Sequence, residues 1–172
     1  MKKKLQLPNV TLLAATSIEV DQTQLALRIS LQNINFGAVK LLSSSEPKKK
    51  YSDINYIKID DMDIMGYNKL IIEDLHKYFE TSHCLIVQSD SFVVDSDLWN
   101  DDFLKFDYIG APWSDEIKVN KNLTLDVKKN PVGNGGFSIR SNKLAEITSK
   151  INYDSLEFPL KSEDILICHY LY

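Results

Sequence analysis

The fold prediction depends on the stretch Cys84-Leu85-Ile86-Val87-Gln88-Ser89-Asp90. Its first four residues are all apolar, which is typical of a short strand that is covered on both faces of a sheet. The following residues are polar, so the chain leaves the core directly after Val87. Ligands of open α/β sheets bind beyond the carboxyl ends of the strands. The segment Gln88-Ser89-Asp90 is therefore the first candidate for a functional site.

Similar patterns of strands and helices lie on both sides of this stretch. The continuous apolar run Val10–Thr16 predicts another buried strand. Asp21 is expected to cap a helix that runs up to a break at Gly37. Its apolar residues recur at roughly helical spacing at Leu25, Ile29, Leu31 and Ile34. Further strands are expected at 38–42, 56–60, 108–112 and 137–139, and helices at 67–79, 97–103 and 141–151. This alternation predicts an α/β fold with a mostly parallel central sheet flanked by helices.

Length and composition limit the classes of protein that fit. The 172 residues, of which 44% are hydrophobic, suffice for one core, so we expect a single domain over 1–172. The net charge of -4 gives no sign of a nucleic-acid-binding surface. No apolar run approaches the roughly 20 residues of a membrane span, and no signal-peptide cleavage site follows Met1-Lys2-Lys3-Lys4. Cys84 and Cys168 lie in apolar runs, as reduced buried thiols do. We therefore predict a cytoplasmic protein without a transmembrane segment.

Asp90 follows a buried strand, where a carboxylate can hold a hard cation together with substrate phosphates. Capping of a turn is the alternative for such an aspartate. Literal Asp-x-Asp patterns also occur at 61–63 and 95–97. The pair at 95–97 precedes an expected helix, where aspartates cap and complement the helix dipole. The pair at 61–63 follows an expected strand and ranks second as a metal site.

Two later segments also carry candidate residues. Gly133-Asn134-Gly135-Gly136 holds three of the six glycines of the chain, and such a loop permits positive backbone angles and close approach to a ligand. A tight turn into a strand is its alternative. Arg140 suits a phosphate contact or a surface salt bridge. Ser162-Glu163-Asp164 predicts a helix start with Ser162 as cap, and a carboxylate fixed there also suits a general base.

Four motifs occur together in this order, and they extend the argument beyond single residues. They are Gln88–Phe92, Tyr108–Trp113, Gly133–Ser141 and Glu163-Asp164. As a set they closely resemble a family of bacterial and eukaryotic proteins that is classed as a domain of unknown function and regarded as glycosyltransferase-like. Pro8–Leu12 and Phe36–Leu41 are similar to that family too, so the resemblance extends over nearly the whole chain.

The resemblance implies a Rossmann-like GT-A fold, the nucleotide-diphospho-sugar transferase fold, in which the donor lies over the first half of the sheet. It implies a divalent cation, Mn²⁺ or Mg²⁺, at Asp90, with Gln88 at the place of the usual first acid. It also implies a glycine loop along the donor sugar and Asp164 as the catalytic base, with Glu163 beside it. The expected donor-binding residues are Thr16, Gln88, Ser89, Asp90, Gly135, Gly136 and Arg140.

The sequence departs from this pattern in two places. Gln88 is neutral, so a metal ion would have one anionic ligand fewer, which puts metal dependence in question. His169 lies five residues after Asp164, and we do not expect it to be the histidine ligand that such enzymes often use. The chain ends at Tyr172 inside an expected helix, which leaves open whether it lacks a C-terminal segment that carries that ligand.

The leading hypothesis is a glycosyltransferase that moves a sugar from a nucleotide-sugar donor to a hydroxyl of a glycan, a lipid-linked or another acceptor. We expect neither a nucleic-acid partner nor a transmembrane segment. A sugar nucleotidyltransferase is one alternative, although no glycine-rich phosphate signature follows Thr16. A non-catalytic relative that binds nucleotides or carbohydrates is the other.

Overall fold

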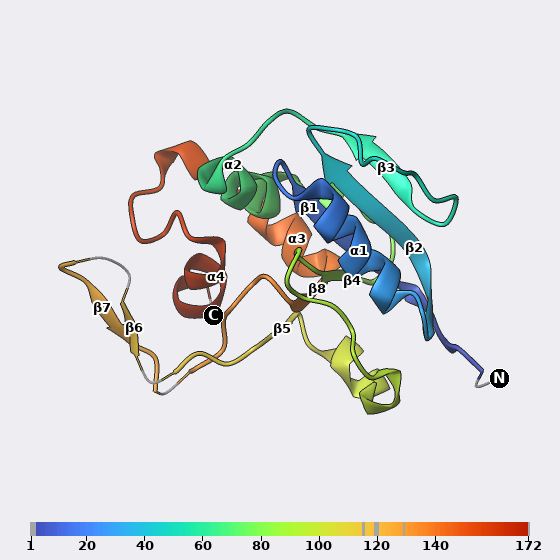
Figure 1. Ribbon diagram of the computed structural model, residues 1–172. Coiled ribbons are helices and arrows are strands. Elements are labelled where there is room, and N and C mark those ends of the chain that lie inside the picture. The colour runs from blue at the N-terminus through green and yellow to red at the C-terminus, as the bar shows by residue number, and fades with distance from the viewer. Residues whose placement is uncertain (1–2, 115, 119–120, 129, 172) are drawn as a thin grey trace.

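The computed structural model describes residues 3–114, 116–118, 121–128 and 130–171. It consists of a central sheet with helices packed against both faces (Figure 1). A small hairpin, formed by β6 (Glu116–Lys118) and β7 (Thr124–Asp126), lies apart from this sheet. The expectations about a signal peptide and about a helix at the end of the chain rest in part on residues outside the described ones, namely Met1, Lys2 and Tyr172.

Among the described residues, six strands form the central sheet in the order β3-β2-β1-β4-β8-β5. β1 pairs in parallel with β2 and β4, and β2 pairs in parallel with β3. β8 runs antiparallel to both β4 and β5. The predicted α/β class with a mostly parallel sheet is confirmed. The strands span β1 Leu5–Thr16, β2 Ile34–Ser43, β3 Asn55–Lys58, β4 His83–Ile86, β5 Tyr108–Gly110 and β8 Ser138–Ser141.

The helices connect these strands and cover the sheet. Two of them continue as π-helical turns: α2 passes into Leu70–Asp74 and then a 3₁₀ turn at Leu75–Lys77, and α4 passes into Leu166–Tyr170. The α-helices span α1 Val20–Ser30, α2 Ile64–Lys69, α3 Asn142–Thr148 and α4 Glu163–Ile165. Further 3₁₀ turns lie at Ser96–Leu98, Asp101–Lys105 and Tyr153–Ser155. The hairpin of β6 Glu116–Lys118 and β7 Thr124–Asp126 was not predicted.

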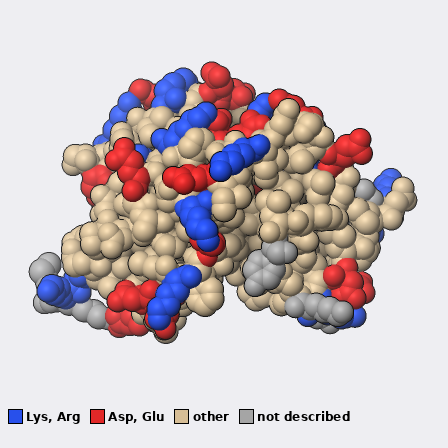
Figure 2. All heavy atoms as spheres, turned by 180° about the vertical axis from the view of Figure 1, so that it is seen from behind, with Lys and Arg blue, Asp and Glu red and all other residues tan. Residues whose placement is uncertain are grey.

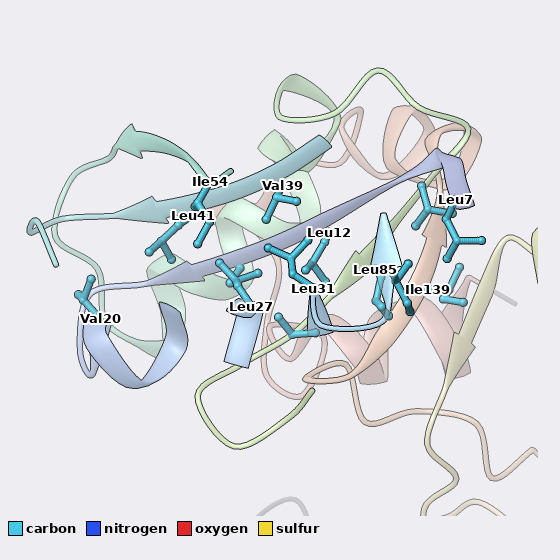
Figure 3. Packing of buried hydrophobic residues seen from close by; sticks show 14 residues of the cluster. Leu7, Leu12, Val20, Leu27, Leu31, Val39, Leu41, Ile54, Leu85 and Ile139 are labelled. Atoms are coloured by element: carbon cyan, nitrogen blue, oxygen red, sulfur yellow. The ribbon is translucent and has the colours of Figure 1, made fainter. Parts of the chain in front are cut away.

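The apolar run of β1 is continuous because both faces of the sheet are buried. Leu12 and Ala14 pack into the cluster beneath α1, which also contains Leu27. Leu13 and Ala15 point to the opposite face and pack into the cluster formed with α2 and its continuation. Figure 3 shows side chains of the first cluster meeting between α1 and the strands. Alternate residues of one strand thus serve two cores.

The predicted boundaries of the first helix were wrong. Glu19, with φ of 52°, is the residue before α1, and Asp21 lies in the first turn, where its carboxylate accepts a hydrogen bond from the Lys48 backbone N–H at 2.9 Å. The helix ends at Ser30. Leu25 is 57% exposed, so the spacing of apolar residues in this segment did not mark its buried face.

Gly37 does not end a helix, because it lies inside β2. A Cβ atom at this position would lie 2.1 Å from the Pro8 carbonyl oxygen of β1. The register of β1 and β2 shifts between Leu7 and Thr11, which is the part of β1 that Gly37 contacts. The glycine therefore permits the two backbones to approach at an irregular point of the sheet.

The structure shows how charged side chains are distributed on one face of the molecule and where the two thiols lie. Lysine, arginine and acidic side chains alternate over the face seen in Figure 2, without a large area of one sign. Cys84 and Cys168 are buried and form no disulfide, as predicted. Within the described parts of the chain, no helix combines the length and apolar character needed to cross a membrane.

Candidate functional site

A cleft of about 290 Å³ opens at the carboxyl ends of β1 and β4. In the sheet, β2 and β3 lie on one side of β1, and β4 lies on its other side. The order in which successive strands are added to the sheet therefore reverses between β1 and β4. Ligand crevices of α/β sheets form at such switch points. The cleft is lined by Ala15, Thr16, Ser17, Ile18, Glu19, Thr23, Met62, Asp63, Ile64, Tyr67, Gln88 and Ser89.

Three of the predicted donor-binding residues, Thr16, Gln88 and Ser89, line this cleft. The Ser89 hydroxyl donates a hydrogen bond to the Glu19 carboxylate at 2.8 Å, which joins the loop after β4 to the loop after β1. Asp90 lies next along the chain in an exposed turn and is not among the lining residues. It therefore lies beside the cleft, with its side chain open to solvent.

The glycine loop meets the end of β4. The Ser91 hydroxyl donates to the Gly136 carbonyl at 2.9 Å and accepts from the Gln88 backbone N–H at 2.8 Å. A Cβ atom on Gly136 would lie 2.6 Å from Gln88 Oε1. Gly136 thus leaves the space that the Gln88 carboxamide occupies at the edge of the cleft.

Backbone angles in this loop differ from the expectation. Among the described residues no glycine has a positive φ, whereas Asn134 has a φ of 50°. The glycines serve close packing instead: a Cβ atom on Gly135 would lie 1.9 Å from Glu163 Oε1. Asparagine tolerates the left-handed region better than most residues, which fits Asn134 at the position with positive φ. Glycine stands at the neighbouring positions, where a Cβ atom would clash.

Arg140 and Glu163 form an ion pair inside the protein. Arg140 Nη2 lies 2.7 Å from Glu163 Oε2, and the two side chains are 1% and 5% exposed. Arg140 Nε also donates to the Ser138 hydroxyl at 3.0 Å. Burial raises the pKa of the Glu163 carboxyl, and the Arg140 guanidinium opposes this effect. Neither residue is among those that line the cleft, and their ion pair joins β8 to α4.

Asp164, the expected base, lies at the start of α4 beside Glu163. Its side chain is partly buried, and Oδ1 accepts from the Ile165 backbone N–H at 2.8 Å. It is not among the lining residues of the cleft. Ser162 does precede α4, but its hydroxyl makes no capping hydrogen bond, so the capping interaction predicted there was wrong.

The two competing Asp-x-Asp patterns have structural roles. Asp63 caps α2 by accepting from the Gly66 backbone N–H at 2.9 Å, although it also lines the cleft. Asp61 accepts from the Ser44 hydroxyl at 3.0 Å. Asp95 accepts from the Asp97 backbone N–H at 2.9 Å at the start of a 3₁₀ turn, as expected for a capping residue.

The Tyr108–Trp113 motif packs against the glycine loop and the C-terminal helix. The Tyr108 hydroxyl donates to the Gly133 carbonyl at 3.2 Å, and a Cβ atom on Gly133 would lie 2.4 Å from the Trp113 ring. His169 stacks on the same ring, with centroids 5.2 Å apart and an angle of 16° between the planes. The histidine therefore packs on the motif.

Tyr67 is a cleft residue that the sequence did not single out. It lies on α2, it is 9% exposed, and its hydroxyl has no hydrogen-bond partner among the described residues. Burial raises the pKa of Tyr67 to about 12, and the Glu163 carboxylate contributes in the same direction. An unpartnered buried hydroxyl is unfavourable by about 1–3 kcal/mol. The only sign of this residue in the sequence was a tyrosine on the face of the predicted helix that was expected to pack against the core.

The described residues hold no group of three or more His, Cys, Asp and Glu side chains that could bind a metal ion. Asp90 offers one exposed carboxylate beside the cleft. Mg²⁺ commonly keeps several waters and is held by one or two carboxylates together with substrate phosphates. The side chains present thus fit a cation whose remaining ligands come from a bound phosphate and water, and they do not form a complete protein site.

Comparison with known proteins gives a family and a distant structural neighbour. A search of curated proteins finds no matching relative. The crystal structure of the glycosyltransferase GlyE in Streptococcus pneumoniae TIGR4 is 14% identical to this chain, with a TM-score of 0.49. The alignment covers 99% of this chain and 45% of that one, so the chain spans less than half the length of that neighbour. The model of a family described as protein of unknown function (DUF5672) matches residues 52–172. The chain therefore belongs to the DUF5672 family.

Proposed function

We propose that this chain carries the donor site of a glycosyltransferase of the GT-A type, which transfers a sugar from a nucleotide-sugar donor to an acceptor hydroxyl. The observation that carries this proposal is the cleft at the point where the strand order reverses, between the carboxyl ends of β1 and β4. Thr16, Gln88 and Ser89 line that cleft. The order of the sequence motifs, which resembles that of glycosyltransferase-like proteins, supports the same assignment.

The glycine loop supports the proposal because it borders the cleft. Gly136 packs against the Gln88 carboxamide, and Gly135 packs against Glu163. The two glycines thereby place the loop between the end of β4 and the start of α4. In the proposed complex this loop lies along the donor sugar, and Gln88 hydrogen-bonds the donor from the cleft edge.

A divalent cation, Mn²⁺ or Mg²⁺, would enter the site with the donor diphosphate and be held on the protein side by Asp90. A bound cation of this kind neutralises charge on the leaving diphosphate. The protein contributes the carboxylate of Asp90, which is exposed beside the cleft, while the neutral Gln88 contributes hydrogen bonds. We expect weak binding of the cation by the protein alone, since a single carboxylate is a poor Mg²⁺ site.

Asp164 is the proposed general base. Its carboxylate is fixed at the helix start by the Ile165 N–H and remains partly exposed, whereas the neighbouring Glu163 is held in the buried ion pair with Arg140. A base must reach the acceptor hydroxyl while its own position is held. Of the two acidic residues in this motif, Asp164 is therefore the one with a free oxygen to act.

A non-catalytic binding protein is the second candidate, and a specific observation favours it. Asp164 is not among the residues that line the cleft, so donor binding and the base are not joined in one cavity. A protein that binds a nucleotide sugar without transferring it would need the cleft alone.

The proposal is tested by thermal-shift measurements with UDP-, GDP- and ADP-linked sugars, each with and without Mn²⁺. A ligand that binds the native state raises the melting temperature. We expect a selective shift that Asp90→Ala abolishes and that Asp164→Asn retains. Asp102→Ala is the matched control, because Asp102 is exposed and forms a surface pair with Lys105. A shift with none of the nucleotide sugars would contradict the proposal.

Turnover separates the two candidate functions. For a transferase, the nucleotide sugar that binds should be hydrolysed slowly in the absence of an acceptor, and Asp164→Asn should reduce this rate while donor binding persists. Binding without any turnover, in the presence of Mn²⁺ and a range of hydroxyl acceptors, would leave the binding protein as the function.

A further inference from the structure

An apolar pocket of about 360 Å³ lies on the face of the sheet that also packs against α1. Leu85 of β4, Ile139 of β8 and Ile109 of β5 line it as one row across the strands, because the register pairs Ile139 with both of the others. Leu85 and Ile139 lie side by side in Figure 3. The segment 93–103 contributes further lining residues, among them Trp99. The apolar pocket therefore lies between the sheet and this segment.

The apolar pocket is long in the direction of the strands. Leu85 pairs with Leu12 of β1, and the lining extends from Leu85 to Leu7, which comes five residues before Leu12 on β1. At about 3.3 Å per residue of strand, this is a length of about 16 Å. A pocket of this length and volume fits a chain-like ligand better than a compact ligand with fused rings.

The side chains around the apolar pocket offer a ligand little besides apolar surface. Hydroxyl and carboxyl groups in its described lining belong to Asp95, Ser96 and Ser138. Ser138 already donates to the Gly135 carbonyl at 2.9 Å, and Asp95 already accepts from the Asp97 backbone N–H at 2.9 Å. The described lining contains neither lysine nor arginine, so it does not suit a phosphate group. A hydrocarbon chain needs no polar partner and is stabilised by transfer out of water.

Solvent reaches the apolar pocket at two large apolar side chains. Leu98 is 75% exposed and Phe137 is 37% exposed, although both line the pocket. Exposed apolar side chains that are grouped in this way mark binding sites, whereas single ones scattered over a surface do not. A ligand can therefore enter beside Leu98 and Phe137.

Two segments of the chain join the apolar pocket to the candidate donor cleft. Ser89 lines the cleft and Val93 lines the pocket, and four residues of chain span at most about 14 Å. Gly136 packs against the Gln88 carboxamide at the cleft edge, and the next residue, Phe137, lines the pocket. A ligand whose apolar end occupies the pocket therefore has its other end within reach of the cleft.

We propose that the apolar pocket binds an unbranched alkyl chain of the acceptor, so that the acceptor is an amphiphile whose hydroxyl group enters the donor cleft beside Phe137. This inference rests on the proposed function, and it names the chemical class of the acceptor. The row of Leu85, Ile139 and Ile109 contacts the alkyl chain. The glycine loop, which separates the pocket from the cleft, holds the polar end of the acceptor next to the donor.

Calorimetric titration with hexyl, heptyl and octyl glucoside tests the pocket, with each compound below the concentration at which it forms micelles. The affinity should rise by about 4-fold with each added methylene, as expected for one further CH₂ group removed from water. Methyl glucoside has the same head group without a long chain. It should bind more weakly than octyl glucoside by a factor of about 100 or more.

Two variants assign this binding to the pocket. Leu98→Asp places a carboxylate against the bound chain, where a charge is unfavourable, so the affinity for octyl glucoside should fall by about 10-fold or more. Val94→Asp is the matched control, because Val94 is 81% exposed in the same segment and is not among the lining residues. It should bind octyl glucoside as the wild type does. Both variants should keep the melting temperature and the affinity for nucleotide sugars of the wild type, since both positions are exposed.

Several results would overturn the inference while the proposed function stands. They are the absence of binding by the three alkyl glucosides, an affinity independent of chain length, and an equal effect of the two aspartate variants. Self-association of the wild type that Leu98→Asp abolishes would also overturn it, because a second copy of the chain would then occupy the pocket. Failure of the wild type to bind any nucleotide sugar would overturn the proposed function, and the acceptor role of the alkyl chain with it.

Discussion

Arg140 on β8 and Glu163 at the start of α4 form a buried ion pair, with 2.7 Å between Nη2 and Oε2. The pair joins the central sheet to the C-terminal helix. Gly135 lies against it, so closely that a Cβ atom there would lie 2.6 Å from Arg140 Nη2. The glycine loop beside the candidate donor site is thus positioned by an internal pair of charges.

Glu163→Gln should destabilise the protein by about 3–5 kcal/mol, because removal of one partner leaves the other charge buried without compensation. The measurement is the free energy of unfolding in urea. Asp53→Asn is the matched control, since Asp53 pairs with Arg28 at 2.6 Å where both side chains are 39% or more exposed. That variant should lose less than about 1 kcal/mol. Equal small losses in both variants would show that the Arg140–Glu163 pair does not stabilise the fold.

Alanine at Gly135 and at Gly136 should give two different defects. Gly135→Ala places a methyl group 1.9 Å from Glu163 Oε1, so it should mainly lower the melting temperature. Gly136→Ala places one 2.6 Å from Gln88 Oε1, a flexible side chain that can move away. Its main effect should therefore be weaker donor binding. Melting curves and calorimetric titrations of both variants separate the two effects, and identical profiles would contradict this assignment.

The thiols of Cys84 and Cys168 should be unreactive in the native protein. Both are buried, and burial raises the pKa of each thiol to about 12, so almost no thiolate is present at pH 8. Incubation with a thiol reagent such as DTNB should label neither residue until urea is added, after which both should react. Rapid labelling of either one without denaturant would show that its surroundings open.

The sequence predicted the fold class well because its strands are buried on both faces. The run Val10–Thr16 is apolar without alternation, and the structure places its residues in two separate cores. Helix boundaries were harder to predict. The spacing of Leu25, Ile29, Leu31 and Ile34 predicted one helix, but Leu25 is exposed and Ile34 begins β2. Gly37 lies in a strand and contacts Pro8 of the neighbouring strand. This contact joins residues far apart in the sequence, so the local pattern could not reveal it.

The candidate site was predicted in part for the same reason. Thr16 is the last residue of the buried strand β1, and Gln88 and Ser89 come shortly after β4. The carboxyl ends of parallel strands lie close together at one edge of a sheet. Arg140 was harder to predict, since a charge within a strand gives no sign of whether its partner lies in the protein or on a ligand. That partner is Glu163, which comes from a distant helix. Tyr67 fits the apolar face of its helix, so its position in the cleft depends on tertiary packing.

The most direct test of the central claim is calorimetric titration of a nucleotide sugar into Ser89→Trp. Ser89 lines the cleft, so an indole there would fill the space that the donor occupies. Ser52→Trp is the control, because Ser52 is exposed and lies outside the cleft. We predict that Ser89→Trp loses donor binding while keeping its fold, and that Ser52→Trp binds as the wild type does. Unchanged binding by Ser89→Trp would contradict the assignment of the donor site to this cleft.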